Sequence, residues 1–428
     1  MKLRNMAEAK AALHPFFEVA AQMAGKHVTL ARTERLMAHI GHPERRLRVI
    51  HVAGTSGKTS TTYYITALLV AAGQKVGHTV SPHINTLAER VSINGKSLDE
   101  ATFCAYLGEF LDLIETAPER PSWFECMIAF AYWVFVREKV DYVVMETGLG
   151  GLQDSTNVAE RVDKVCVITD IGYDHMNVLG SELGRIAYQK AGIIHDGNTA
   201  LMYEQDDEVM RIVRYWVSQH EDAELLTFSQ DRLERAYGGE FAHNLPAFQR
   251  RNWLLAFAVY RFAAQRDELA LLAAPALQRT QSTKVPGRMD SHSIAGKTIV
   301  FDGAHNQQKM HMFVDSFMQL YPDRNVPVLM ALKQGKEAAA VATEIAHMAS
   351  SVIVTTFDKG QDLPDTAMDP TEIARALDQA GVPDITVEPD TRAAFDLLIS
   401  NTDDIGVVTG SFFLVSQLEQ MHPRSARD

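Results

Sequence analysis

A short glycine-rich segment carries the clearest chemistry in the sequence. Gly54-Thr55-Ser56-Gly57-Lys58-Thr59-Ser60 follows a β-type run, Arg48–Ala53, and opens a helical pattern at about 58–72. Glycines let backbone N–H groups curl around an anion, and a helix amino end adds a positive dipole end. Lys58 supplies a point charge for the β- and γ-phosphates. A glycine-rich turn with a surface lysine is the simpler alternative, but the strand–turn–helix context favours a phosphate loop. The loop is a variant, because Val52 stands where the strict motif has glycine.

Polar side chains also follow the later strands. Glu146 comes directly after the buried-type run Asp141–Met145. Ligands of open α/β sheets bind beyond the carboxyl ends of strands, so Glu146 is placed to hold a magnesium ion that bridges phosphates. His175 lies past the run Lys164–Thr169 and is either a second metal ligand or a histidine at the rim of the core. Asp154 is interpreted as a cap or turn residue on its spacing alone.

These residues require an α/β scaffold. Strand patterns that are apolar on both faces alternate with helical ones, which predicts parallel sheets covered on both sides. The alternation restarts after Arg279–Met289, with strands expected at 298–301, 326–332, 351–356 and 406–409. We therefore predict a domain over residues 1–289 and a smaller α/β domain over 290–428. Residues 1–47 are predicted to be helical, polar and peripheral.

Composition narrows the class of protein. The 428 residues include 46% hydrophobic and 22% charged side chains, as in globular proteins, and a chain of this length predicts two or three domains. A net charge of −13 argues against a nucleic-acid partner. No apolar run reaches the length of a signal peptide or membrane span, and the three cysteines have no framework spacing. We expect a cytoplasmic protein without a membrane partner.

Several motifs in order resemble those of the folylpolyglutamate synthase/dihydrofolate synthase family of the Mur ligase superfamily. The resemblance covers about Arg48 to Val415. It rests on the segments Gly54–Ser60, Ser81-Pro82-His83, Glu89-Arg90, Glu146–Gly151, Asp154–Asn157, Asp174-His175, Lys190–Ile194, Pro286-Gly287-Arg288 and Asp302–Asn306.

The resemblance implies the fold, the reaction and the ligands. The fold would be an amino-terminal P-loop ATPase-type parallel sheet domain and a smaller carboxyl-terminal Rossmann-like ligase domain. The reaction would be ATP-dependent addition of L-glutamate to a pteroate or folate carboxylate through an acyl phosphate. The ligands would be ATP, two Mg²⁺ ions, the pterin carboxylate and L-glutamate, all bound to a monomer.

The resemblance also assigns roles to residues. Lys58, Glu146, His175, Lys190 and Arg288 would be catalytic, with Lys190 carbamylated. Ser81 and Glu146 would hold one metal ion, and His175 with Glu146 the second. The substrate side would use Pro82, His83, Arg90 and Asp154. The nucleotide would be bound by Gly54, Thr55, Gly57, Lys58, Thr59, Ser60, Asn252, Arg288, Asp302 and His305.

The substrate side departs from the family pattern more than the ATP side. Leu152 replaces an arginine, and Val285 replaces the tryptophan often found before Pro-Gly-Arg. In the phosphate-loop motif, the threonine at position 59 matches the cell-wall Mur ligases better than the synthases. One alternative is therefore another amide ligase of the superfamily, for a muropeptide or an unassigned acid. Another is a non-catalytic nucleotide-binding protein, which the joint presence of the five catalytic candidates argues against.

Overall fold

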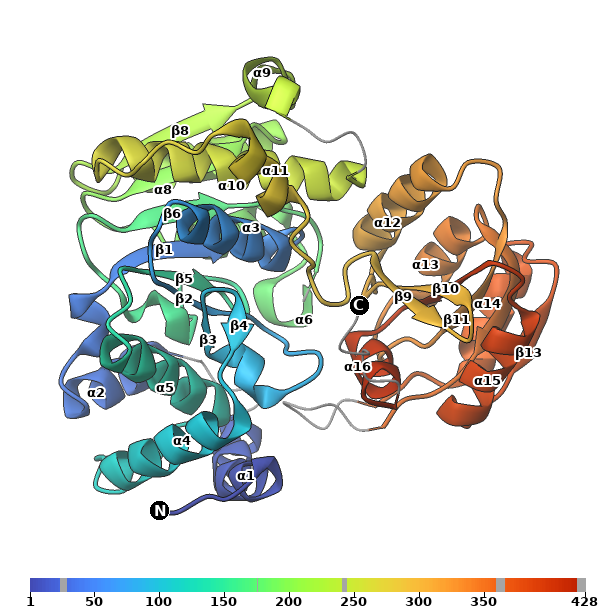
Figure 1. The fold of residues 1–428 in the computed structure, drawn as a ribbon, viewed down its shortest axis with the longest axis horizontal. Helices are drawn as coiled ribbons and strands as arrows, with labels where there is room; N and C mark the ends of the chain where they lie inside the picture. The colour runs from blue at the N-terminus through green and yellow to red at the C-terminus, as the bar shows by residue number, and fades with distance from the viewer. Residues whose placement is uncertain (24–28, 175, 241–244, 359–365, 422–428) are drawn as a thin grey trace. The chain divides into compact units, whose positions relative to one another are not determined.

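The computed structural model describes residues 1–23, 29–174, 176–240, 245–358 and 366–421 (Figure 1). The chain forms two compact units. The first comprises Met1–His243 and Gln249–Thr283, and the second comprises Asn244–Phe248 and Lys284–Asp428. Each unit has its own sheet with helices on both faces, as the alternating sequence pattern predicts.

The first sheet has the strand order β4-β3-β2-β5-β1-β6-β7-β8. Its pairings are parallel from β2 to β8, and the short strands β3 and β4 are antiparallel. The strands are β1 (Arg48–Ala53), β2 (Val76–Thr79), β3 (Ser92–Ile93), β4 (Lys96–Ser97), β5 (Tyr142–Glu146), β6 (Val165–Ile168), β7 (Thr199–Tyr203) and β8 (Glu224–Phe228).

The helices of the first unit cover both faces of this sheet. They are α1 (Met6–Met23), α2 (Ala31–His39), α3 (Lys58–Ala71), α4 (Glu100–Ile114), α5 (Trp123–Arg137), α6 (Met176–Leu179), α7 (Leu183–Ala191), α8 (Asp207–Val217), α9 (Gln230–Tyr237), α10 (Ala247–Arg266) and α11 (Ala274–Gln281). Short 3₁₀ turns lie at η1 (Pro43–Arg46), η2 (Leu87–Arg90), η3 (Ser155–Val158) and η4 (Gly238–Glu240).

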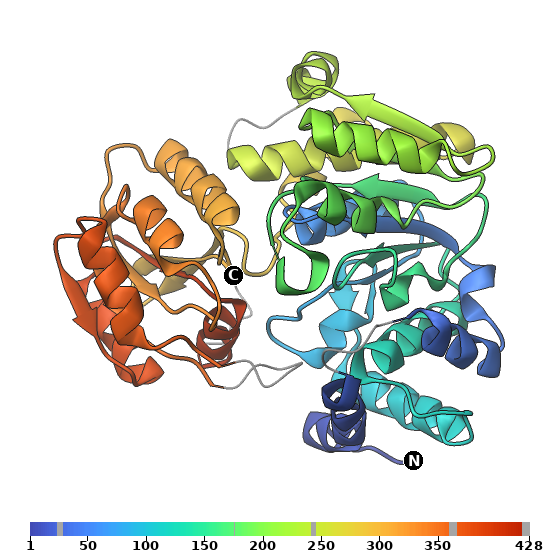
Figure 2. The same ribbon diagram turned by 180° about the vertical axis from the view of Figure 1, so that it is seen from behind.

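Different helices pack on the two faces of the first sheet. Figure 1 looks onto α3, α10 and α11, whereas the view from behind in Figure 2 shows α7 and α8 on the other face. Cys166 and Ile168 of β6 point to the α7 and α8 side and join one buried cluster with Ile186 and Val213. The strands are apolar on both faces because both are covered.

The amino-terminal helix α1 is not peripheral, contrary to the prediction for residues 1–47. Ala9 and Leu13 of α1 are almost fully buried and belong to the core cluster that contains residues of α4 and α5. They are spaced four residues apart and so share one helix face, which packs inward, while Lys10 between them is exposed.

The second sheet has the order β13-β12-β11-β14-β10-β9, parallel except for the β10–β9 pair. The four strands expected here are found, and β9 and β13 were not predicted. The elements are β9 (Asp290–Ile294), β10 (Lys297–Phe301), β11 (Val326–Met330), β12 (Ala349–Val354), β13 (Ile385–Val387), β14 (Ile405–Thr409), α12 (Gln307–Leu320), α13 (Ala338–Ile345), α14 (Pro370–Gln379), α15 (Thr391–Asn401) and α16 (Phe412–Met421).

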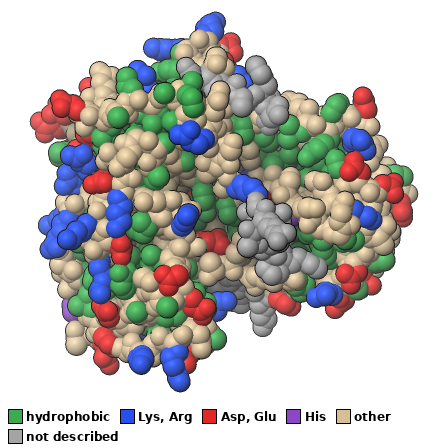
Figure 3. All heavy atoms as spheres, viewed as in Figure 1, with side chains coloured by type: hydrophobic (Ala, Val, Ile, Leu, Met, Phe, Trp, Pro, Cys, Tyr) green, Lys and Arg blue, Asp and Glu red, His purple; other side chains and the backbone are tan. Residues whose placement is uncertain are grey.

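The surface carries both signs of charge. On the face shown in Figure 3, Lys and Arg side chains are scattered among Asp and Glu rather than gathered into one field. None of the helices in the described ranges combines the length and apolar character needed to cross a bilayer.

Candidate functional site

The glycine-rich loop connects β1 to α3, as its sequence predicts. Gly54 and Gly57 have φ angles of 155° and 87°, and Gly57 is the residue before the first helical turn. A Cβ atom on Gly57 would overlap the side-chain amide of Asn252 in α10. Only glycine therefore suits this turn, and Asn252 lies against the loop.

Two lysines meet at one carbonyl group of the loop. The Nζ atom of Lys58 lies 3.1 Å from the Gly54 oxygen, and the Nζ atom of Lys190 lies 2.8 Å from the same oxygen. Lys190 belongs to the last turn of α7 and is only 4% exposed. Two ammonium groups this close repel each other, so the arrangement favours an anion bound beside them.

A buried carboxylate faces the start of α3. Glu146 is 2% exposed at the carboxyl end of β5. Its Oε1 atom accepts a hydrogen bond from the Thr59 hydroxyl at 2.9 Å, and its Oε2 atom accepts one from the Ser81 backbone N–H at 3.3 Å. The sequence places Thr59 on the phosphates, but the structure also brings it to Glu146.

The hydroxyls around Glu146 suit a hard cation. The buried Oγ atoms of Ser60 and Ser81 have no hydrogen-bond partner among the described residues. Carboxylate and hydroxyl oxygens are the ligands that magnesium and similar divalent cations prefer. The residues present therefore fit a divalent cation at the loop. His175, the expected ligand of a second ion, lies outside the described residues.

An ion pair that the sequence did not reveal supports the phosphate loop. The backbone N–H groups of Thr55 and Ser56 donate to the Asp170 carbonyl oxygen at 2.8 and 3.1 Å. The Asp170 carboxylate accepts from two guanidinium nitrogens of Arg251, at 2.7 and 3.0 Å. Arg251 also stacks on the Tyr203 ring at 3.8 Å. In the sequence, the only sign that Arg251 belongs to the site is its position next to Asn252, a nucleotide-site candidate.

The segment after β2 forms a compact, tightly bonded turn. The Glu89 carboxylate accepts backbone hydrogen bonds from Ile84, Asn85 and Thr86 at 2.7–2.9 Å. Ser81 and Pro82 are joined by a cis peptide bond. This turn carries Pro82, His83 and Arg90, the residues expected on the substrate side.

Arg90 and His83 are in direct contact. Arg90 Nε donates to His83 Nδ1 at 3.1 Å, and the guanidinium group lies 4.5 Å from the Trp123 ring centroid. Burial, followed by the charge of Arg90, holds the pKa of His83 well below its usual value. His83 is therefore a neutral acceptor that orients Arg90. The sequence gives no sign of the contact with Trp123, because an aromatic residue in a helix has no positional signature.

Asp154 is bound by backbone and hydroxyl groups of its own segment. Its carboxylate accepts from the N–H groups of Leu149 and Thr156 at 2.8 and 3.0 Å and caps η3. Burial raises its pKa, and these hydrogen bonds partly oppose that rise. The contacts are those of the cap that its spacing suggests.

The expected nucleotide residues of the second unit form one cluster. Asp302 follows β10, is buried, and accepts backbone hydrogen bonds from Met289 and Ala304 at 2.9 and 2.8 Å. Burial raises its pKa to about 6, although the charge of Arg288 acts in the opposite direction. Arg288 lies 4.1 Å from the Phe412 ring centroid, and the His305 ring packs against the edge of the same aromatic group.

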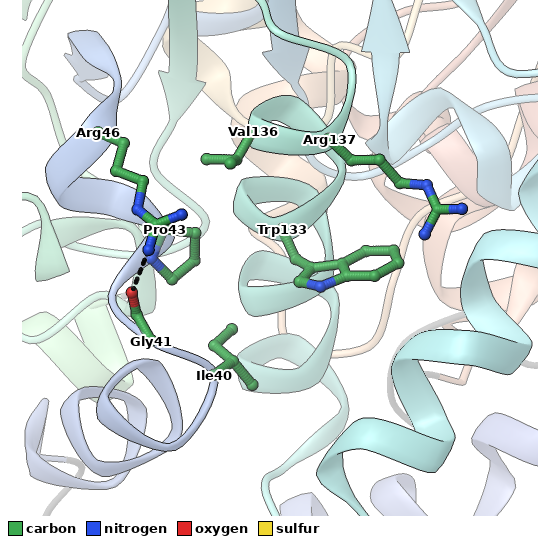
Figure 4. A pocket seen from close by; sticks show the side chains of 7 residues that line it. All are labelled: Ile40, Gly41, Pro43, Arg46, Trp133, Val136 and Arg137. Carbon is green, nitrogen blue, oxygen red and sulfur yellow. Dashed lines mark hydrogen bonds between the residues drawn. The ribbon is translucent and has the colours of Figure 1, made fainter.

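A separate hollow of about 300 Å³ lies between η1 and α5 (Figure 4). It is lined by Ile40, Gly41, Pro43, Arg46, Trp133, Val136 and Arg137. These residues precede β1 and β5 in the chain, so the hollow lies at the amino ends of those strands. The phosphate loop and Glu146 follow the same strands and lie at the opposite edge of the sheet.

The chain matches two family models. The Mur ligase middle domain matches residues 52–249, and the Mur ligase glutamate ligase domain matches residues 287–412. The dihydrofolate synthase/folylpolyglutamate synthase of Bacillus subtilis is 29% identical over 417 residues, covering 91% of this chain and 94% of that protein. The folylpolyglutamate synthase of Lacticaseibacillus casei is 28% identical, covering 97% and 98%.

Solved structures share the same fold. The Mycobacterium tuberculosis folylpolyglutamate synthase complexed with ADP aligns with a TM-score of 0.79 and 25% identity, covering 97% of this chain and 99% of that one. The Yersinia pestis bifunctional enzyme complexed with AMPPNP and a manganese ion aligns with a TM-score of 0.80 and 22% identity, covering 99% of both chains.

Proposed function

The chain belongs to the folylpolyglutamate synthase/dihydrofolate synthase family of the Mur ligase superfamily, and from this premise we propose that it joins L-glutamate to a pteroate or folate carboxylate at the expense of ATP. The observation that carries the proposal is the meeting of Lys58 and Lys190 at the Gly54 carbonyl group, beside the buried Glu146 carboxylate. Lys58 provides positive charge for phosphates, and Glu146 provides a carboxylate for a cation.

The proposed reaction has two steps. A carboxylate oxygen of the pterin substrate attacks the γ-phosphorus of ATP, so that an acyl phosphate forms and ADP leaves. The amine of L-glutamate then attacks the acyl carbon, phosphate leaves, and the amine loses a proton as the amide forms. Lys58 and the backbone N–H groups at the start of α3 bind the phosphate oxygens and offset the repulsion between the reacting anions.

We assign the cation to the oxygen ligands around Glu146. Glu146, Ser81 and the Thr59 hydroxyl would hold Mg²⁺, which supplies charge neutralisation of the phosphates when bound. Support comes from the Thr59 contact with Glu146 and from the buried Ser81 hydroxyl. A second Mg²⁺ at His175 is proposed from the family likeness alone.

The further roles in this proposal also follow the family likeness. Asn252, Asp302 and His305 would bind the nucleotide, and Arg288 its phosphates. His83, Arg90, Pro82 and Asp154 would border the pterin. Residues 1–289 would form the ATP-binding domain and residues 290–428 the ligase domain, in a cytoplasmic monomer.

Lys190 is proposed to be carbamylated during catalysis. Its neutral amine would add to CO₂ with loss of one proton, which replaces a cation by an anion able to bind magnesium. We expect Lys190→Ala to lower kcat by about 10²-fold or more, as for loss of other charge-positioning groups. Bicarbonate should not restore activity, because the amine is gone. Full activity of the variant in steady-state assays would rule out a required carbamate.

The function is tested by phosphate release with ATP, Mg²⁺ and L-glutamate. Dihydropteroate, tetrahydrofolate and no acceptor are compared. Stimulation by dihydropteroate supports the dihydrofolate synthase activity, and stimulation by tetrahydrofolate supports polyglutamylation. If neither stimulates release while ATP still binds, the pterin assignment is wrong, and muropeptide and other carboxylic acids become the acceptors to test.

A further inference from the structure

A second group of side chains of metal-ligating types lies within the second unit, close in the chain to the nucleotide-site candidates Arg288 and Asp302. Asp290 and His292 come from β9, and Glu419 comes from α16. One ligand atom of each residue lies within 4.8 Å of the others. The side chains of Asp290, His292 and Glu419 are 3%, 8% and 2% exposed. None of the three residues has a role in the proposed reaction.

The strand geometry explains why the three side chains meet. Residues two apart on a strand point to the same face, so Asp290 and His292 share one face of β9. They pair with Phe301 and Ile299 of β10, and the His292 ring packs against the Phe301 ring at a centroid distance of 4.9 Å. This aromatic contact orients the imidazole toward Glu419.

Both carboxylates converge on the same nitrogen. His292 Nε2 lies 3.5 Å from Asp290 Oδ2 and 3.7 Å from Glu419 Oε1. It makes no hydrogen bond to any described residue, although its side chain is more than nine-tenths buried. One N–H bond cannot point at two acceptors at once, and neither distance is that of a good hydrogen bond.

These separations suit a shared cation. A tetrahedral ion with bonds of about 2.0–2.1 Å to nitrogen and oxygen holds its ligand atoms about 3.4 Å apart. Imidazole nitrogen and carboxylate oxygen atoms are the ligands that zinc takes in proteins, and a cation bound between the three side chains would be attracted to both carboxylates. The combination of imidazole and carboxylates favours a transition metal such as Zn²⁺ over Mg²⁺.

An exposed histidine in the same unit shows the contrasting arrangement. His311 also contacts two carboxylates, but Glu344 lies at Nδ1, 3.0 Å away, and Asp315 lies at Nε2, 3.4 Å away. The two contacts are on opposite ring nitrogens, as for ordinary hydrogen-bonded ion pairs. No single ion can bridge all three groups there.

We propose that Asp290, His292 and Glu419 form a structural binding site for a divalent transition metal, with Zn²⁺ as its ion, that fastens α16 to the edge strand β9. The ion would join the carboxyl-terminal helix to an antiparallel strand that pairs on one side only. No step of the proposed ligase reaction uses this ion.

The test is zinc binding by the full chain without nucleotide, after removal of metals by a chelator. We expect one Zn²⁺ per chain by mass spectrometry of the dialysed protein. His292→Gln and Glu419→Gln should each weaken binding by at least about tenfold. His311→Gln is the matched control and should bind normally. Glu146→Gln should also keep this ion, which separates it from a cation at the phosphate loop.

Thermal unfolding gives a second readout. Zn²⁺ should raise the melting temperature of the wild type and of His311→Gln by several degrees, since a ligand of the native state stabilises it. Glu419→Gln keeps the side-chain shape and should show no zinc-dependent rise. No zinc binding by the wild type, or zinc that is lost in Glu146→Gln but retained in His292→Gln, would overturn the proposal.

Discussion

At the scale of residues, the site depends on charges that would repel each other without a ligand. Lys58 and Lys190 both donate hydrogen bonds to the Gly54 carbonyl oxygen. A neutral carbonyl group stabilises an ammonium charge less than an anion would. A phosphate bound by Lys58, or the carbamate proposed for Lys190, would convert repulsion into attraction. The loop is therefore built for its ligand more than for its own stability.

We predict that Lys58→Ala lowers kcat for phosphate release by about 10²–10³-fold, because charge compensation at the phosphates is lost. The fold should persist, since the Lys58 hydrogen bond lies on the loop and outside the core. Circular dichroism checks the fold, and the matched change Lys96→Ala in β4, at an exposed site, should leave turnover unchanged. Wild-type turnover of Lys58→Ala would contradict the phosphate-loop assignment.

The buried carboxyl group of Asp302 leads to a prediction about how the free energy of unfolding depends on pH. Burial raises its pKa from 3.8 to about 6, with Arg288 and Lys309 partly opposing the rise. A carboxyl group with a raised pKa in the folded protein contributes stability at low pH and loses it as pH rises through the folded value. The wild type should therefore lose up to ~3 kcal/mol relative to Asp302→Asn between about pH 3 and pH 7.

The measurement is urea unfolding of both proteins across this pH range, compared as a difference so that other titrating groups cancel. Above about pH 7 the difference should be constant. A difference that does not change with pH would show that Asp302 titrates at its ordinary value.

At the scale of elements, the phosphate loop is held by a neighbouring loop and a helix. Arg251 in α10 binds Asp170, whose carbonyl group receives the N–H groups of Thr55 and Ser56. The carboxylate is 15% exposed and the guanidinium group 19%, so water screens this pair only partly. Loss of the pair would loosen the segment after β6 and, through it, the turn that precedes α3.

We predict that Asp170→Asn lowers the free energy of unfolding by about 1–3 kcal/mol and raises the KM for ATP, because a partly buried guanidinium loses its partner. The neighbouring pair Arg250–Glu234, with contacts of 2.8 Å and shorter, offers a control. Glu234→Gln breaks a similar pair that does not contact the loop, so its KM should stay normal. Equal KM changes in both variants would mean that the Asp170 pair has no specific role.

At the scale of the whole molecule, the chain has two compact units with separate hydrophobic cores. All four tryptophans, at positions 123, 133, 216 and 253, belong to the first unit. Fluorescence therefore reports on one unit, whereas far-ultraviolet circular dichroism reports on the helices and strands of both.

We predict that urea unfolding followed by tryptophan fluorescence and by circular dichroism gives curves that do not coincide, since each unit can unfold around its own core. Added Zn²⁺ should move the part of the dichroism curve that fluorescence does not report. Superimposable curves under all conditions would show that the two units unfold as one.

Much of this protein follows from local patterns in its sequence. The alternation of apolar strands and helices, the turn from Gly54 to Lys58 and the place of Glu146 after a strand are short-range features, and the structure has β1, α3 and β5 where they predict them. The edge strands β9 and β13 were missed, because short strands with exposed polar residues lack the apolar signature of a buried strand.

Tertiary structure alone decided which distant residues meet. Arg251 lies 81 positions from Asp170, and Lys190 lies 136 positions from Gly54. The group of Asp290, His292 and Glu419 likewise joins an edge strand to the last helix. Such contacts depend on strand order, register and the packing of helices over a sheet face, and no local spacing encodes them. The sequence determined the kind of chemistry through residue type and turn geometry, whereas packing decided which charges share one site.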